Sequence, residues 1–369
     1  MTFADAFAGR RVLVTGHTGF KGAWLAEWLT VLGADVTGYA LDAPTTPSLF
    51  EALGLEGRVR HVVADIRDRE RMAAEMQAAQ PEIVFHLAAQ AIVRTAYQQP
   101  HETFEANVMG TVNVLEAARA CDSVKAVVIV TSDKSYQNLE TGRPFRETDP
   151  MGGRDPYSAS KGAAELVVEA YRQSFFGDGA AVASVRAGNV IGPGDWAVDR
   201  IIPDIIRAVT AGRPVVVRNP DAVRPWQHVL EPLSGYLWLG AQLLQTGRDY
   251  AGPWNFGPTS TGGDRTVRWL VDQFLERWGS GTWVTPADGT PQPHEAHHLS
   301  LDSSKARERL HWAPVWDAPM AVSQTAAWHA AYRDDPSTAR PMLEAQIARY
   351  VEEAGRARLP WAADARRNA

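Results

Sequence analysis

Three side chains that can take part in proton transfer follow one apolar run in the sequence. Ser132, Asp133 and Lys134 stand in the stretch TSDKSY, directly after VKAVVIV. Such a stretch, taken alone, is typical of a solvated turn, because serine and aspartate are common turn residues. The preceding run is almost wholly apolar, which is typical of a strand buried on both faces. In a parallel sheet, the three side chains would lie at the edge where such sheets bind ligands.

A tyrosine and a lysine follow at helical spacing. Tyr157 and Lys161 in DPYSASK are four residues apart, so on a predicted helix they share one face. A tyrosine with an ordinary pKa near 10 is a poor base at neutral pH, and lowering that pKa by about three units needs roughly 4 kcal/mol. An adjacent ammonium and a positively charged nicotinamide ring could supply this preference for phenolate. The pair therefore predicts a tyrosine base supported by a lysine.

A glycine loop closes the first predicted strand, RVLVT. Gly16, Gly19 and Gly22 have the spacing GxxGxxG, which suits a tight turn, a close approach to a pyrophosphate and helix packing on a strand. The N-terminus of the following helix would offer free N–H groups to the phosphates. Glycines at a strand–helix turn can also have a purely conformational use. Their place after the first of six strands favours a dinucleotide site.

The ends of later strands agree with the same ligand. Asp65 and Ile66 follow one strand and suit the amino group and ring face of adenine, while Ala88 and Ala89 follow another and leave room for the nucleotide. An acid for the adenosine ribose is expected about twenty residues after the glycines, and Asp42 stands two residues late for it. Because no arginine stands there to bind a 2′-phosphate, we expect NAD and not NADP.

Short β-branched runs alternate with amphipathic segments in the first half, which predicts an α/β fold with a Rossmann-type doubly wound parallel sheet and a smaller C-terminal α/β substrate-binding lobe. We expect an NAD-binding domain over residues 1–187, joined by about 225–250. The lobe is predicted over 188–224 and 251–335, with most of the tryptophans in its core. Residues 336–369 are predicted as a peripheral helix with a frayed tail. The expected strands are 11–15, 34–40, 60–64, 82–88, 124–131 and 181–187. The expected helices are 20–32, 68–79, about 102–120 and about 157–175.

Bulk properties exclude several classes of protein. The chain has 369 residues, with 37 basic and 43 acidic residues spread along it and a net charge of -6, which argues against nucleic-acid and anionic-membrane partners. The single cysteine, Cys121, cannot form an internal disulfide and is predicted to be a small buried side chain at a helix end. We see no signal pattern and no run long enough to span a bilayer. The sequence favours a soluble protein of the cytoplasm.

Several longer motifs resemble the extended short-chain dehydrogenase/reductase family, over about residues 10–335. The shared motifs are TGHTGFKG, DIRD, HLAAQ, NVMGTVNVLEA, TSD and YxxxK. Within the family the chain is most similar to sugar-nucleotide 4,6-dehydratases, and to their CDP-glucose branch, through GYALDAPT, TSDK, PMGGRDPYSASK, VRAGNVIGPGDW, RPWQHVLEPLSGY and HEA. This resemblance implies a hydro-lyase of deoxysugar biosynthesis with NAD as cofactor, contacted also by Thr18 and Phe20.

The resemblance also implies a mechanism. Tyr157 takes the proton of the 4-hydroxyl while the C4 hydrogen is transferred to NAD⁺, and Ser132 hydrogen-bonds the 4-oxygen. The 4-ketone acidifies C5, water leaves from C6, and the hydrogen returns to C6. Asp133 matches the acid that protonates the leaving hydroxyl, which requires a raised pKa such as burial provides. Because no net oxidation occurs, the cofactor should stay bound through turnover.

Lys134 departs from the family pattern. Relatives that act on dTDP-glucose carry a glutamate there as the base for the C5 proton, and an ammonium cannot accept a proton. Lys134 is either neutral, or charged and stabilising the enolate while another group moves the proton. The CDP-glucose branch resembles this sequence in having the lysine, so we take it as a marker of that branch.

Five residues are expected to contact the nucleotide sugar. Asn189 and Arg224 match family residues that contact the sugar diphosphate, as a diphosphate requires, and Arg94 could face the diphosphate or the sugar. His294 and Glu295 are candidates for reading the nucleotide. We expect no metal site, since the histidines near them would need a helix to converge and HHLSLD looks extended.

Three other functions have to be weighed. An NAD-dependent 4-epimerase on the same fold would need no acid for C6, so Asp133 argues against it. A dehydratase for another nucleotide sugar stays open, because nothing in the sequence fixes the base. A silent NAD-binding module would be expected to lose Tyr157 or Lys161.

The helices near 102–120 and 157–175 resemble those that pair between subunits in the family, so we expect a homodimer or a tetramer.

Overall fold

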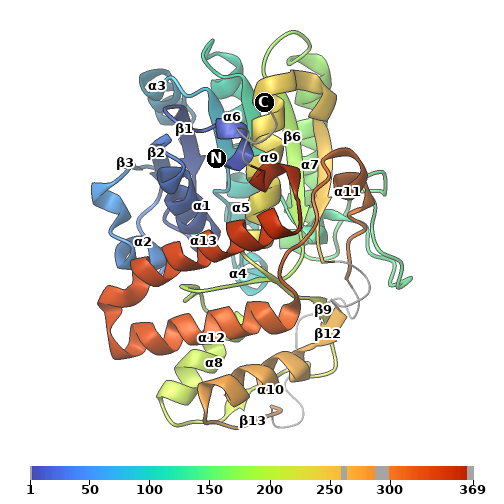
Figure 1. Cartoon of the computed structure of the whole chain (residues 1–369). Coiled ribbons are helices and arrows are strands. Elements are labelled where there is room, and N and C mark those ends of the chain that lie inside the picture. Colours follow the sequence, from blue (N-terminus) through green and yellow to red (C-terminus); the bar gives the residue numbers. More distant parts are fainter. Residues whose placement is uncertain (1, 259–263, 287–298, 364–369) are drawn as a thin grey trace.

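A parallel sheet of seven strands forms the centre of the computed structural model, which describes residues 2–258, 264–286 and 299–363 (Figure 1). The strand order is β11-β6-β5-β4-β1-β2-β3, and every neighbouring pair is parallel. The α/β Rossmann-type prediction is therefore confirmed. The strands are β1 (Arg11–Thr15), β2 (Asp35–Ala40), β3 (Arg60–Val63), β4 (Ile83–His86), β5 (Ala126–Val130), β6 (Ala181–Ala187) and β11 (Gly252–Phe256).

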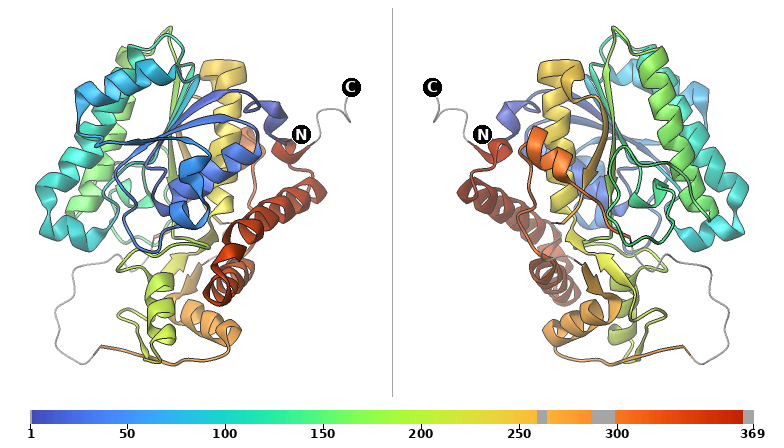
Figure 2. Two further views of the ribbon diagram at one scale, coloured as in Figure 1. Left: turned by 90° about the vertical axis from the view of Figure 1, so that its left-hand side faces the viewer. Right: turned by 90° about the vertical axis from the view of Figure 1, so that its right-hand side faces the viewer.

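Helices cover both faces of the sheet, as the two side views in Figure 2 show. On one face, α3, α6 and α7 bury methionine, valine and leucine side chains against the strands. On the other face, α1 and α9 do the same with leucine and tryptophan. Buried side chains therefore leave the central strands in both directions, which explains their unbroken apolar runs. These helices are α1 (Phe20–Val31), α3 (Arg69–Ala79), α6 (Gly110–Arg119), α7 (Pro156–Ser174) and α9 (Leu230–Thr246).

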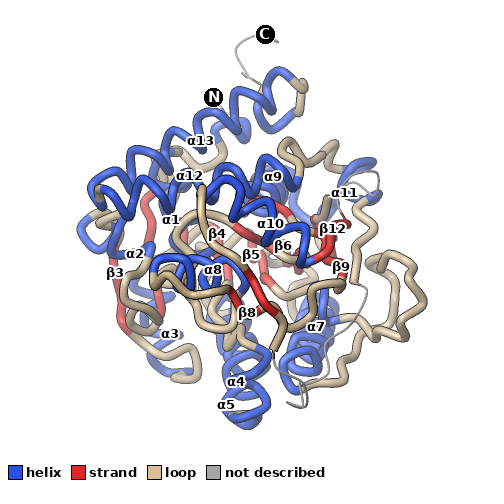
Figure 3. Tube along the Cα trace, turned by 90° about the horizontal axis from the view of Figure 1, so that it is seen from below, coloured by secondary structure: helices blue, strands red, loops and turns tan. Residues whose placement is uncertain are grey.

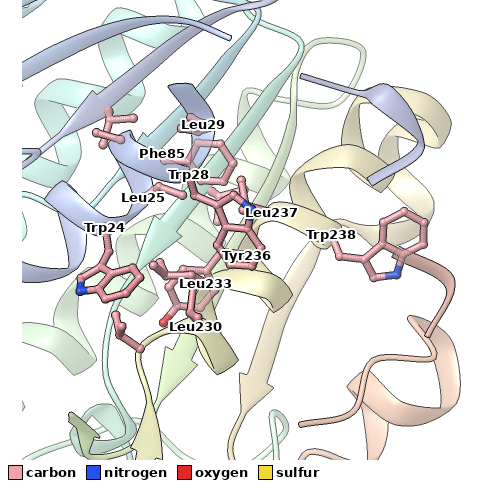
Figure 4. Close-up of a cluster of buried hydrophobic side chains, with 14 of the residues drawn as sticks. Trp24, Leu25, Trp28, Leu29, Phe85, Leu230, Leu233, Tyr236, Leu237 and Trp238 are labelled. Carbon is pink, nitrogen blue, oxygen red and sulfur yellow. The ribbon is translucent and has the colours of Figure 1, made fainter. Parts of the chain in front are cut away.

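Large side chains fill the layer between the sheet, α1 and α9 (Figure 4). Trp24 and Trp28 of α1 and Tyr236 of α9 are at most 1% exposed. Gly240 of α9 lets that helix approach β4, because a Cβ there would lie 2.9 Å from a carbon of Phe85. Further helices on this side and at the sheet edge are α2 (Leu49–Ala52), α11 (Ser304–Arg309) and α13 (Ala339–Arg356), whereas α4 (Val93–Gln98) and α5 (Pro100–Phe104) pack against α7.

A smaller lobe lies beyond the carboxyl ends of the strands, below the sheet in Figure 1, and overlaps the sheet in the view from below (Figure 3). Its core joins apolar side chains of α8, α10 and α12 with those of short strands. The strands pair as three ribbons, β7 with β10, β8 with β13, and β9 with β12. The elements are β7 (Val190–Ile191), α8 (Ile201–Thr210), β8 (Val215–Val216), β9 (Val223–Pro225), β10 (Gln227–His228), β12 (Asp264–Thr266), α10 (Val267–Trp278), β13 (Trp283–Val284) and α12 (Ala318–Asp334).

The expected lobe boundary at residue 251 differs from the structure. Residues 252–256 form β11, which pairs with β6 and extends the large sheet. The pairing depends on tertiary structure, because α9 forms a parallel crossover that brings β11 back beside β6. Sequence patterns do not specify such a crossover. The predicted helix over 102–120 is also divided, because a π-helix (Glu105–Met109) separates α5 from α6.

The tryptophans were expected mainly in the lobe, and that expectation is wrong. Trp254, Trp312, Trp328 and Trp361 are buried in the large core beside the sheet and not in the core of the lobe. The predicted frayed tail is also wrong as far as residue 363. Trp361 is fully buried and stacks on Phe3 with ring centroids 5.1 Å apart. The terminal segments therefore complete the core together.

Glu231 attaches the C-terminal segments to α9 from inside the core. Its carboxylate accepts hydrogen bonds from the backbone N–H groups of Val315 (2.9 Å) and Trp316 (2.6 Å) and from the hydroxyl of Tyr350 in α13 (2.7 Å). The side chain is fully buried, and this burial raises its pKa to about 8.

The described part of the chain contains no helix long and apolar enough to cross a membrane.

Replacing Glu231 should change how stability depends on pH. Its folded-state pKa of about 8 lies above the usual 4.5, so the folded protein holds a proton that the unfolded chain releases. The contribution is fully present below pH 4.5 and is lost as pH rises towards 8, by about 1.4 kcal/mol per unit. We expect Glu231→Gln to flatten the free energy of unfolding across that range, measured by urea denaturation.

A surface glutamate of α13 provides the control. Glu352 is 63% exposed and pairs with Arg356 at 2.5 Å, so Glu352→Gln should keep the wild-type slope. A Glu231→Gln variant with the wild-type slope would contradict the prediction.

Candidate active site

A cleft of about 790 Å³ lies between the carboxyl ends of the strands and the lobe. It is lined by every residue predicted for the site that falls within the described parts of the chain. These are Gly16, Thr18, Gly19, Phe20, Gly22, Asp42, Asp65, Ile66, Ala88, Ala89, Arg94, Ser132, Asp133, Lys134, Tyr157, Lys161, Asn189 and Arg224. The other two, His294 and Glu295, lie outside the described residues.

The glycine loop forms a cradle of bare backbone at one end of the cleft. Gly16 has a φ of +76°, and a Cβ there would lie 2.7 Å from the backbone nitrogen of Ala88. A Cβ on Gly22 would lie 2.0 Å from the carbonyl oxygen of Gly16. Helix α1 begins at Phe20 without a side-chain cap, so its N-terminus can donate hydrogen bonds into the cleft. The cradle therefore fits a dinucleotide pyrophosphate.

The ends of β2 and β3 form the wall expected to hold adenosine. Thr18 donates to the carbonyl oxygen of Leu41 at 2.9 Å, which ties the glycine loop to the segment containing Asp42. The carboxylate of Asp65 accepts hydrogen bonds from the guanidinium of Arg67, including one of 2.6 Å from Nη2, and from its backbone N–H at 2.8 Å, and this hydrogen bonding lowers the pKa of Asp65. Ile66 packs on Gly110, where a Cβ would lie 2.8 Å from Cγ2.

The segment with Ser132, Asp133 and Lys134 follows β5 and contains a single turn of 3-10 helix, Asp133–Ser135. Ser132 caps it: its Oγ accepts a bond from the backbone N–H of Lys134 (3.2 Å) and donates to Oδ1 of Asp133 (3.0 Å). The other carboxyl oxygen, Oδ2, is buried without a hydrogen-bond partner. Burial raises the pKa of Asp133, against the nearby charges of Lys134, Lys21 and Arg224. Burial therefore shifts the pKa of Asp133 in the direction that an acid requires.

Tyr157 and Lys161 share the face of α7 that borders the cleft. The helix begins with an Asp155 cap, whose carboxylate accepts the backbone N–H of Ser158 at 3.0 Å. Lys161 donates from Nζ to the carbonyl oxygen of Val130 at 3.3 Å. Burial lowers its pKa to about 8, while burial raises the pKa of Tyr157. The lowering that a tyrosine base requires is therefore not supplied by the tyrosine's surroundings in the protein.

Among the charged residues of the cleft that sequence reasoning missed are Lys21, Asp195 and Arg200. Lys21 lies in the glycine loop motif TGHTGFKG, and burial lowers its pKa to about 8. Arg200 acts electrostatically on both Lys21 and Tyr157. Asp195 is 4% exposed, and burial raises its pKa. The signal for Lys21 was a cation inside a phosphate-binding loop, whereas Asp195 and Arg200 stand in an irregular segment with no periodic pattern.

Asn107 begins the motif NVMGTVNVLEA, and the sequence alone predicts no role for it. It lies in the π-helix, and π-bulges are frequent at functional sites. Its Nδ2 donates to the hydroxyl of Ser160 at 2.8 Å, between Tyr157 and Lys161 on α7. Its Oδ1 accepts the backbone N–H of Gln90 at 2.8 Å. Asn107 therefore links the catalytic helix to the loop after β4.

The residues expected to bind substrate lie towards the lobe. Arg94 approaches Oδ1 of Asp199 at 3.6 Å, and Arg224 lies on β9 with Nη1 donating to the carbonyl of Val223 at 2.8 Å. The backbone oxygen of Asn189, another residue that lines the cleft, accepts the N–H of Gln227 at 3.0 Å. Within the described ranges we find no group of three or more histidine, cysteine, aspartate or glutamate residues that could hold a metal ion.

This arrangement provides a buried acid, a tyrosine with a neighbouring lysine, and a pyrophosphate cradle in one cleft. A family model described as GDP-mannose 4,6 dehydratase matches residues 13–325. The chain belongs to this family. A CDP-glucose 4,6-dehydratase from Salmonella typhimurium is 51% identical over 331 residues, covering 88% of this chain and 91% of that protein.

Members of this dehydratase family and epimerases share the structure. A dTDP-glucose 4,6-dehydratase from Streptomyces venezuelae with NAD bound has a TM-score of 0.71 and 27% identity, over 90% of this chain and 99% of that one. A UDP-glucose 4-epimerase from Thermus thermophilus in complex with NAD has a TM-score of 0.73 and 27% identity, over 86% and 98%.

Proposed function

We propose that the protein is a hydro-lyase that converts CDP-D-glucose to CDP-4-keto-6-deoxy-D-glucose with bound NAD. The observation that carries the reaction type is Asp133, a buried carboxyl with a raised pKa and an unpartnered oxygen. It lies in the same cleft as Tyr157 and Lys161. An elimination of water needs such an acid, whereas an epimerisation at C4 does not. The similarity to the Salmonella enzyme supports CDP-glucose as the substrate.

The cradle at Gly16, Gly19 and Gly22 would hold the pyrophosphate of NAD, with Asp42 and Asp65 towards the adenosine. When bound, NAD⁺ supplies a two-electron acceptor and a positive ring charge. The pKa of Tyr157 is raised by burial, so the phenolate needs additional positive charge. Lys161 provides part of this positive charge. Its Nζ lies within hydrogen-bonding range of the carbonyl oxygen of Val130 at the end of β5.

The residues of the chain then move two protons. Tyr157 takes the proton of the 4-hydroxyl, and Ser132 donates a hydrogen bond to the 4-oxygen. Asp133, held protonated by its burial, gives its proton to the hydroxyl that leaves C6. Asn189, Arg224 and Arg94 would position the diphosphate and sugar from the lobe side.

Two roles fit the amine of Lys134, which lines the cleft beside Asp133. As a neutral amine it would take the C5 proton. As an ammonium it would stabilise the enolate that forms when another group takes that proton.

The function is tested by incubating the purified protein with CDP-, dTDP-, GDP- and UDP-glucose. We expect mass spectrometry to show loss of one water from CDP-glucose. Loss of water from a different member of the panel would assign another base, and a conversion without mass change would favour an epimerase. No reaction with any of the four would refute the proposal.

Two variants should separate the proton transfers. Asp133→Asn keeps the shape but cannot donate a carboxyl proton, so we expect dehydration to fall about 10²-fold or more while C4 oxidation continues, seen as reduced cofactor at 340 nm. Lys134→Met should abolish exchange of the C5 hydrogen with solvent deuterium if the lysine moves that proton. Unchanged exchange would leave the enolate-stabilising role.

We also propose that the chain forms a homodimer or a tetramer through the π-helix region and α7. Exposed apolar side chains support this surface, among them Phe104 (39%), Met109 (51%) and Leu166 (62%). Light scattering should give a mass of at least twice 40.4 kDa. Leu166→Lys should reduce it to one chain, and a wild-type monomer would contradict the assembly.

A further inference from the structure

A buried ion pair lies behind the catalytic lysine. Glu165 is one turn after Lys161 on α7, and its carboxylate accepts two parallel bonds from Arg186 on β6, each 2.8 Å long. The hydroxyls of Ser184 (2.7 Å) and Thr131 complete its acceptor set. The side chains of Glu165 and Arg186 are 4% and 3% exposed. Removing two charges from water is costly, so a pair this buried calls for a use beyond stability.

The pair contacts the catalytic segment at both of its ends. Glu165 accepts the hydroxyl of Thr131, directly before Ser132. Arg186 donates from Nη1 to the hydroxyl of Tyr136 at 2.5 Å and lies over its ring, 4.7 Å from the centroid. Tyr136 in turn donates to Oδ1 of Asn255 on β11 at 2.7 Å. Residues 132–135, which contain the acid and the lysine, are thus suspended between two anchors of one ion pair.

The same pair faces the lysine that supports the base. Lys161 is surrounded by Glu165 on its own helix, by His86 at the end of β4 and by Lys21 at the start of α1. Burial lowers the pKa of His86 to about 3, so this imidazole is neutral. Lys21 opposes a charge on Lys161, and Glu165 favours it. Arg186 and the hydroxyl donors keep the pKa of Glu165 lowered despite its burial, so it remains ionised.

We propose that Glu165 and Arg186 are positioning residues of the active site, which fix segment 131–136 at both ends and place a negative charge next to Lys161. The proposal deepens the proposed function and rests on it for its kinetic consequences. The mechanical part stands on the contacts alone and can be tested without substrate.

The kinetic test uses Glu165→Gln, which keeps the size of the side chain and removes its charge. Lys161 should then lose its proton at lower pH, so the alkaline limb of kcat against pH should move down by about one unit, and kcat should fall roughly tenfold or more. Glu165→Asp keeps the charge but cannot reach Arg186 and Thr131 together. It should lower kcat and leave the alkaline limb in place.

A second ion pair provides the matched control. Glu27 of α1 is fully buried and pairs with Arg58 at 2.5 Å, outside the residues that line the cleft. Glu27→Gln should lower stability without moving the alkaline limb. A purely structural role for Glu165 predicts that Glu165→Gln behaves in the same way, and that result would overturn the proposal.

The anchors can be tested separately by hydrogen–deuterium exchange without any ligand. Tyr136→Phe removes one anchor, and Thr131→Val removes the other, while the ion pair stays intact. Each should speed backbone exchange within residues 131–136 by roughly tenfold, and Glu27→Gln should not. Wild-type exchange in both anchor variants would refute the positioning role even if Glu165→Gln fails to fold. Because this measurement needs no turnover, it remains decisive if the wild type dehydrates no nucleotide sugar.

Discussion

All strands of the central sheet run in one direction, and the rest of the molecule depends on that constraint. Parallel strands end at the same edge, so every loop that follows a strand arrives beside the others. The loop after β1 is therefore a bare-backbone cradle pressed on Ala88, and the loop after β5 places Asp133 in the same cleft as Tyr157 of α7. Because helices cover both faces, this edge is the place left for ligands, and the lobe closes over it. The cleft therefore lies where the strands of the sheet end.

Much of this could be predicted from the sequence, because the information is local. Buried parallel strands must be apolar on both sides, so their positions agree with the structure to within about two residues. The glycines of the loop and the pair Tyr157–Lys161 could be assigned by spacing alone, since a tight turn and a helical face are short-range features. The single cysteine, Cys121, is buried just after α6 as its small size suggested.

The rest could not be predicted because it depends on partners far apart in the chain. Nothing near residue 252 indicates that β11 will pair with β6, and nothing near Trp254 shows which core will bury it. The positions of the charged residues in the cleft could not be predicted for the same reason. Glu165 looks like an ordinary glutamate of an amphipathic helix until Arg186, on a strand twenty-one residues later, meets it. Irregular segments such as the one with Arg200 carry no period from which an orientation can be deduced.

The stacking of Trp361 on Phe3 has a consequence for the order in which the protein is made. Phe3 precedes all seven strands of the sheet in the chain, whereas Trp361 follows them all and is therefore synthesised after them. The nascent chain must therefore complete most of the sheet while the layer beside α1 and α9 is still open, and such open apolar surface favours aggregation. A chain that ends before α13 would leave the core beside α1 and α9 exposed to water, which favours aggregation.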